Sequence, residues 1–227
     1  MIQRDYILRM IEEFMQALAR IRRAKQQKQW DEASGDLNTE FKRLIGANFQ
    51  TALEMSETEL LARIIRGEPT HLVRNKIFML ATLLKEAGDV ALARDQTAEW
   101  QTCYLKSLHL LLDTVGRDDI FECPEFVPKV HLLTEALAST PLPTRTHAML
   151  MQHFERTGEF AKAEDSLHAM LEADPENSGI VEFGVAYYQR LLGQSDSMLA
   201  GGGLPRFEVE EGLKELRHRR IRSDLPK

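Results

Sequence analysis

Residues 147–177 read HAMLMQHFERTGEFAKAEDSLHAMLEADPEN, a stretch with the pattern of two short amphipathic helices. Thr157-Gly158 separates the two helical segments, and Asp174-Pro175 closes the second, since proline cannot continue a helix. The pattern therefore predicts one helical hairpin. Such a hairpin cannot bury both of its faces alone, so we expect neighbouring helices to stack on it.

The composition of the rest of the chain agrees with a helical protein. Hydrophobic residues make up 43% of its 227 residues and charged residues 28%, enough apolar material for a folded core. Strand formers rarely alternate, and long segments rich in Leu, Ala, Glu, Lys, Arg and Gln favour helix. The sequence therefore predicts an all-α protein.

The charge and the cysteine content exclude several classes of protein. A formal net charge of -6 argues against a surface that binds nucleic acid as a whole. Cys103 and Cys123 are the only cysteines, too few for a disulfide scaffold, and we expect both to be reduced thiols. The charged start, MIQRDYILRMIEEF, predicts no export signal, and no apolar run is long enough for a membrane span. We expect a soluble, cytoplasmic protein with no membrane partner.

Residues 2–29 carry the pattern of one long N-terminal helix. Its apolar residues recur at spacings of three and four and form one stripe: Ile7, Met10, Ile11, Phe14, Leu18 and Ile21. The stripe either packs on the body of the same chain or forms a heptad-like seam for self-association. The basic run from Arg20 to Lys28 follows, and a helix C-terminus favours such cations electrostatically.

Caps and breakers divide the rest of the chain. A second helix over residues 36–48 contains Gly46, which we expect to weaken its last turn, and Ser56 with Glu59 forms a capping box. Further helices are expected over residues 72–87, 90–113, 125–139, 178–192 and 208–221. Gly88-Asp89 is interpreted as a break between the first two, and Gly201–Gly203 as a flexible break before the last helix.

Residues 144–177 resemble a tetratricopeptide repeat. Leu150 and Phe154 match the packing positions of its first helix, Gly158-Glu159-Phe160 its inter-helix turn, and Ala163 the small residue where its helices touch. His147 and Met151 depart from the motif, which has a large aromatic and a small residue at these positions. A partial second copy is aligned on Gly88, about two repeat periods earlier, with a distorted copy containing Pro128 between them.

The resemblance implies antiparallel hairpins stacked as an irregular, tetratricopeptide-like right-handed superhelix. We expect one helical-repeat domain over residues 1–227, with N-terminal helices over 1–68, repeats over 70–193 and a C-terminal helix over 204–222. From MIQRDY at its start to GGGLPRFEVEEGLKEL near its end, the chain also resembles a bacterial family of tetratricopeptide-like proteins of unassigned function.

Tetratricopeptide proteins usually bind partner peptides on the concave face formed by the first helix of each repeat. The resemblance places these residues there: Asn75, Phe78, Thr82, Lys85, Arg145, Ala148, Gln152, Arg156, Glu182 and Gln189. For each of them the alternative is a solvated surface without a ligand. The family's carboxylate clamp, a lysine and an asparagine, is absent, because Phe78 and Thr82, or Ala148 and Gln152, occupy its positions.

No motif in the sequence indicates catalysis, a cofactor or a metal. His147 and His153 lie on different faces of one helix, and the acids Asp113, Asp118, Asp119 and Glu122 lack the alternation of a calcium loop. We expect these acids to raise the pKa of Cys123, which disfavours a nucleophilic role.

The hypothesis that fits best is a non-enzymatic scaffold that binds a protein, or a second copy of itself, through the concave face and the N-terminal helix. Two alternatives stay open. One is a nucleic-acid-associated regulator that uses the basic run of residues 20–28 with the arginines of residues 217–222. The other is an enzyme whose catalytic groups converge from distant helices without a local motif.

Overall fold

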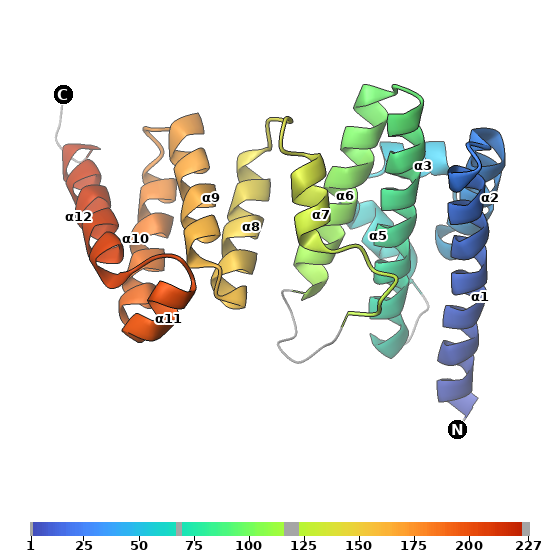
Figure 1. The fold of residues 1–227 in the computed structure, drawn as a ribbon, viewed down its shortest axis with the longest axis horizontal. Coiled ribbons are helices and arrows are strands. Elements are labelled where there is room, and N and C mark those ends of the chain that lie inside the picture. The colour runs from blue at the N-terminus through green and yellow to red at the C-terminus, as the bar shows by residue number, and fades with distance from the viewer. Residues whose placement is uncertain (1, 67–69, 116–122, 224–227) are drawn as a thin grey trace. The chain divides into compact units, whose positions relative to one another are not determined.

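The computed structural model describes residues 2–66, 70–115 and 123–223. Over these residues the chain forms twelve helices and no strand, so the predicted all-α class is confirmed (Figure 1). The helices belong to two compact units, an N-terminal unit of Met1–Pro141 and a C-terminal unit of Leu142–Lys227. The expected single repeat domain and its superhelical arrangement stay predictions, and each unit is described by itself.

The N-terminal unit contains seven of the helices. Their bounds are α1 Ile2–Gln26, α2 Trp30–Ile45, α3 Phe49–Glu54, α4 Glu57–Ile65, α5 Thr70–Ala93, α6 Thr97–Val115 and α7 Val130–Ala136. The longest of them, α1, has the extent expected from its stripe, and Phe14, Leu18 and Ile21 are buried. It packs against α2 and α5, while Phe14 meets the ring of Phe126 at a centroid distance of 5.3 Å.

The ends of the short helices show where local sequence signals were sufficient. The capping box is confirmed, because Glu59 N donates to Ser56 Oγ at 3.3 Å and Ser56 N donates to Glu59 Oε2 at 2.7 Å. The interpretation of Gly46 is wrong. It does not lie inside α2 but ends it in the left-handed conformation, with φ of 69°, which glycine adopts without strain.

The predicted break at Gly88-Asp89 is also wrong, because α5 continues through both residues to Ala93. The turn comes instead at residues 94–96, where Asp95 adopts a φ of 57°. Gly88 serves a contact between helices, since a Cβ built on it would lie 2.5 Å from the ring of Tyr104 in α6. The partial repeat aligned on Gly88 therefore has no turn at that position.

The helix expected over residues 125–139 corresponds to α7, which is shorter than predicted and spans Val130–Ala136. Pro128 precedes α7, where its missing N–H costs no helical hydrogen bond. The sequence Gly67-Glu68-Pro69 also predicts an end to the helix that begins after Ser56. These residues, like the acids Asp118, Asp119 and Glu122, lie outside the described residues.

The C-terminal unit contains the helical hairpin predicted over residues 147–177. Its helices are α8 Thr144–Thr157, α9 Phe160–Ala173, α10 Ser178–Leu192, α11 Asp196–Gly201 and α12 Arg206–Ser223. Gly158 links α8 to α9 with a φ of 76°, and Ala163 is fully buried, so the predicted hairpin is confirmed. The bounds of α10 are those expected from the sequence.

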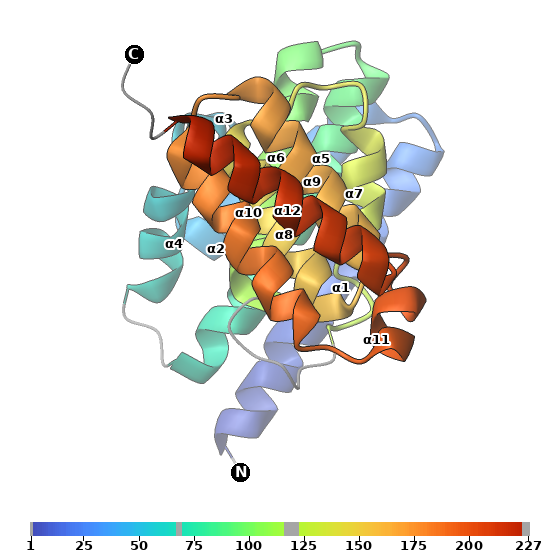
Figure 2. The same ribbon diagram turned by 90° about the vertical axis from the view of Figure 1, so that its left-hand side faces the viewer.

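The triple glycine is not the flexible break that we expected. Gly201 ends α11, a short helix missed by the sequence analysis, and Gly202 packs tightly against the hairpin turn. A Cβ on Gly202 would lie 2.4 Å from Gly158 O, and Gly202 O accepts a hydrogen bond from Ala161 N at 3.0 Å. This contact orients the chain as it enters α12, which lies across α10 (Figure 2).

Candidate functional site

Four of the predicted partner-binding residues lie on α5, and the structure separates them. Phe78 and Thr82 are 1% and 0% exposed, and the Thr82 hydroxyl donates to the Phe78 carbonyl at 2.8 Å. Asn75 and Lys85 are half-buried, and Lys85 Nζ bonds Asp89 Oδ2 at 2.8 Å. α5 is surrounded by α1, α2, α4 and α6, so its middle turns form core rather than an accessible face.

The predicted residues of the C-terminal unit lie at its surface. Arg145, Gln152 and Arg156 are exposed on α8 and, at spacings of seven and four, share one stripe. Gln189 and Glu182 are exposed on α10, whereas Ala148 is half-buried. The structure brings three of these residues together on one helix. That they bind a partner stays a prediction.

α1 presents several apolar side chains to solvent. Leu8 and Met15 are 50% and 40% exposed, and Tyr6, on another side of the helix, is 54% exposed, whereas Phe14 and Ile21 are buried. Leu8 and Met15 are seven residues apart and share a face, and the exposed acid Glu12 lies on that face between them. This face, Leu8–Glu12–Met15, is an unpartnered part of an amphipathic helix.

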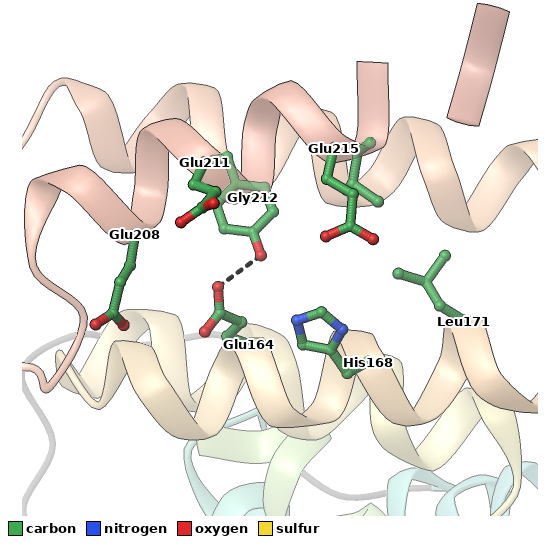
Figure 3. A pocket seen from close by; sticks show the side chains of 9 residues that line it. Glu164, His168, Leu171, Glu208, Glu211, Gly212 and Glu215 are labelled. Atoms are coloured by element: carbon green, nitrogen blue, oxygen red, sulfur yellow. Dashed lines mark hydrogen bonds between the residues drawn. The ribbon is translucent and has the colours of Figure 1, made fainter. Parts of the chain in front are cut away.

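A partly open cavity of about 230 Å³ lies in the C-terminal unit between α9, α10 and α12 (Figure 3). Four glutamates line it: Glu164 from α9 and Glu208, Glu211 and Glu215 from α12. His168, one turn after Glu164, lines the same cavity, together with Tyr188 and the apolar Leu171 and Leu216. We refer to this site as the acidic cavity.

Tyr188 connects the three helices that enclose the acidic cavity. Its side chain is 1% exposed, and its hydroxyl donates to Glu164 Oε1 at 2.6 Å (Figure 3). α12 crosses directly over the ring at Gly212, where a Cβ would lie 2.4 Å from the tyrosine Cζ. Tyr188 thus supports α12 and holds the carboxylate of Glu164 in one place.

Burial and the neighbouring carboxylates disfavour the ionised form of Glu164. Burial raises the pKa of Glu164 above its ordinary value, and the nearby carboxylates of Glu208 and Asp165 add to this rise. The hydrogen bond from Tyr188 and the proximity of His168 oppose the rise but do not cancel it. The pKa of Tyr188 is also raised, by burial and by Glu164, so the phenol stays a neutral donor.

Buried carboxylates occur in the N-terminal unit as well, but with cationic partners. Glu86 on α5 accepts hydrogen bonds from Arg22 Nε at 2.8 Å and from Lys25 Nζ. Asp89, one turn later, accepts from Lys25, from Lys85 and, at 2.7 Å, from the Tyr104 hydroxyl. Burial opposes ionisation of Asp89, yet Lys25 and Lys85 outweigh burial and hold its pKa below the ordinary value.

The described residues provide little for metal or thiol chemistry. Among them, no group of three or more His, Cys, Asp or Glu side chains is arranged to hold a metal ion. Burial raises the pKa of Cys103 to about 12 and also raises that of Cys123, so both thiols are poor nucleophiles at neutral pH. No helix in the described part of the chain is long and apolar enough to cross a membrane.

None of the residues that line the acidic cavity was predicted from the sequence as part of a functional site. One signal was present, because Glu208, Glu211 and Glu215 recur at spacings of three and four and must share a face of the last helix. Nothing in the sequence indicated that Glu164 would face them, since that depends on how α12 crosses α9 and α10.

Comparison with known proteins gives a family but no activity. No curated protein and no solved structure matches the chain. A family model described as "Family of unknown function (DUF6483)" matches residues 1–220, nearly the whole chain. The chain is therefore a member of this family of unknown function.

Proposed function

We propose that the protein is a non-enzymatic interaction module that binds a partner protein through the Leu8–Glu12–Met15 face of α1. The observation that carries this proposal is the difference in burial between two faces of one helix. The face of Phe14, Leu18 and Ile21 is buried in the N-terminal unit, whereas Leu8 and Met15 on the neighbouring face remain 50% and 40% exposed.

Water makes such a face unfavourable unless another surface covers it. Full burial of a Leu or Met side chain stabilises a protein by roughly 1.5–3 kcal/mol relative to exposure. Contiguous apolar surface on a folded protein commonly marks an interaction site. Methionine side chains are also enriched at protein interfaces, and Met15 supplies one on this face.

The chemistry of the face defines the partner that would fit. Leu8 and Met15 require an apolar groove of the kind that accepts an amphipathic helix. Glu12 between them favours a groove with a basic group opposite its carboxylate, since a buried unpaired charge would weaken binding. We therefore infer a protein partner with an apolar groove and a lysine or arginine at its rim.

The basic alternative for nucleic acid receives less support. Arg22 and Lys25, two cations of the N-terminal basic run, pair with Glu86, which offsets part of the positive charge there. The exposed stripe of Arg145, Gln152 and Arg156 on α8 remains a second surface for a protein partner, as the resemblance implied.

Site-specific photo-crosslinking in native lysate tests the proposal. A photoreactive residue at Leu8 should capture one defined protein, and Met15→Glu in the same chain should abolish that capture. The matched control places the photoreactive residue at Arg20, which is exposed but turned by about 140° from Met15. Capture of the same protein at both positions, or capture that survives Met15→Glu, would overturn the proposal. Capture of the chain itself would identify the partner as a second copy.

A further inference from the structure

α12 packs on the rest of the C-terminal unit through a small apolar face. Val209, Leu213 and Leu216 are buried, and their spacing of four and three places them on one face. Leu216 fits over Gly184 of α10, where a Cβ would lie 2.5 Å from its side chain, and Gly212 fits over Tyr188. Both close approaches occur in the observed docking position of α12.

The same docking position brings like charges together. From α12, Glu208, Glu211 and Glu215 line the acidic cavity that also contains Glu164 of α9 (Figure 3). Glu215 has a cationic partner, because Arg219 of α12 donates to it at 2.8 Å. The other groups that face Glu164 are Asp165 and His168 from α9 and the Tyr188 hydroxyl from α10. Among the described residues that line the cavity, His168 is the only basic one.

Apolar contact and charge therefore act in opposite directions on α12. The buried leucines and valine favour the docked position, whereas ionised carboxylates on the two sides of the cavity repel one another. Protonation of Glu164 reduces that repulsion without changing the apolar contacts of α12. The balance between the two terms depends on the protons bound in the cavity.

We propose that α12 is a pH-sensitive latch, held against α9 and α10 while the Glu164 carboxyl in the acidic cavity is neutral and loosened when that carboxyl is ionised. This inference does not depend on the proposed role of α1. The raised pKa of Glu164 supports it, because the neutral form of that carboxyl is the one that the docked helix favours.

Loosening of α12 would uncover apolar surface on α9 and α10. Leu167 and Leu171 of α9 and Val185 of α10 are buried in the docked state, and Gly184 lies beneath Leu216.

Hydrogen exchange of the full chain, measured by mass spectrometry at about pH 5 and about pH 7.5 and corrected for intrinsic rates, tests the latch. Peptides from α12 should be protected severalfold less at the higher pH, while peptides from α8 should change less. A difference between the two helices separates opening of α12 from unfolding of the whole unit. Equal protection of α12 at both pH values would overturn the proposal.

Two pairs of variants sharpen the test. Glu164→Gln keeps an oxygen acceptor for Tyr188 but removes the charge, so it should reduce the pH dependence of α12 and protect it more at the higher pH. Glu172→Gln, an exposed acid of α9 outside the cavity, should leave the pH dependence unchanged. On α12, Glu211→Gln and its exposed neighbour Glu210→Gln form the equivalent pair. Equal effects within each pair would contradict a role for the cavity.

Discussion

The two units contain the same local arrangement in opposite electrostatic surroundings. In the N-terminal unit the ring of Tyr104 packs over Gly88, and its hydroxyl donates to Asp89 at 2.7 Å. In the C-terminal unit the ring of Tyr188 packs under Gly212, and its hydroxyl donates to Glu164 at 2.6 Å. In both, a glycine allows close approach and a tyrosine holds a carboxylate at a helix interface.

The difference lies in the groups around the carboxylate. Lys25 and Lys85 surround Asp89 and lower its pKa, whereas burial and other acids raise the pKa of Glu164. A tyrosine–carboxylate contact therefore does not by itself determine how the contribution of the carboxyl group to stability changes with pH. Neighbouring charges decide whether the ionised or the neutral carboxyl favours the folded state.

Removing the cation that joins the two carboxylates of the N-terminal unit should have the largest effect. Lys25→Met leaves Glu86, whose side chain is 1% exposed, with Arg22 as its remaining cationic partner. Loss of one partner of a buried ion pair typically costs about 3 kcal/mol, which we expect as a decrease in the free energy of unfolding in urea. Lys42→Met, at an exposed position of α2, should change it little. An equal effect of both changes would show that the network does not stabilise the unit.

The close approach at glycine is tested by a pair of alanine substitutions. Gly88→Ala should destabilise the N-terminal unit by about 1–3 kcal/mol, because the new Cβ would overlap the Tyr104 ring. Gly35→Ala in α2 has no atom within 4 Å of the new Cβ and should stabilise the helix by roughly 0.5–1 kcal/mol. Thermal melts of the two variants give the comparison. A stabilised Gly88→Ala would mean that the two helices do not approach closely there.

The smallest effect should come from Glu164→Gln in the C-terminal unit. Because the pKa of Glu164 is raised, its contribution to stability is present below the ordinary value of 4.5 and is lost as the pH rises through the raised value. At neutral pH the amide should therefore stabilise the unit slightly, by about 0.5 kcal/mol, since the cavity is partly open to water. Urea unfolding at two pH values measures this. A destabilised variant at neutral pH would contradict the expected sign.

Asp89 has the opposite sign. Its lowered pKa gives stability that is present above the ordinary value of 3.8 and is lost as the pH falls through the lowered value. On acidification, the C-terminal unit should therefore be stabilised through Glu164 at a higher pH than the one at which the contribution of Asp89 is lost.

The features of the fold that were predictable are those fixed by neighbouring residues. Ser56 with Glu59, the Gly158 turn and the bounds of α10 each depend on chemistry within one turn of helix, and all three are confirmed. Gly88 was misinterpreted because a glycine that ends a helix and a glycine that admits a neighbouring ring look the same in sequence. The distinction depends on Tyr104 of the next helix.

The candidate site was less predictable for the same reason. The resemblance placed Phe78 and Thr82 on an accessible face, but α5 is enclosed by four helices, and a spacing rule for one repeat does not contain that information. The acids of α12 could be placed on one face from their spacing, whereas their position opposite Glu164 required the path of the chain through Gly202.

The most direct test of this comparison is an NMR titration of the side-chain carboxyl carbons in the full chain, which reports each group separately. We expect Asp89 to titrate below its ordinary value of 3.8 and Glu164 above its ordinary value of 4.5. Titration of both groups at their ordinary values, or shifts of the reverse sign, would contradict the account that neighbouring charges make the two tyrosine–carboxylate contacts respond oppositely to pH.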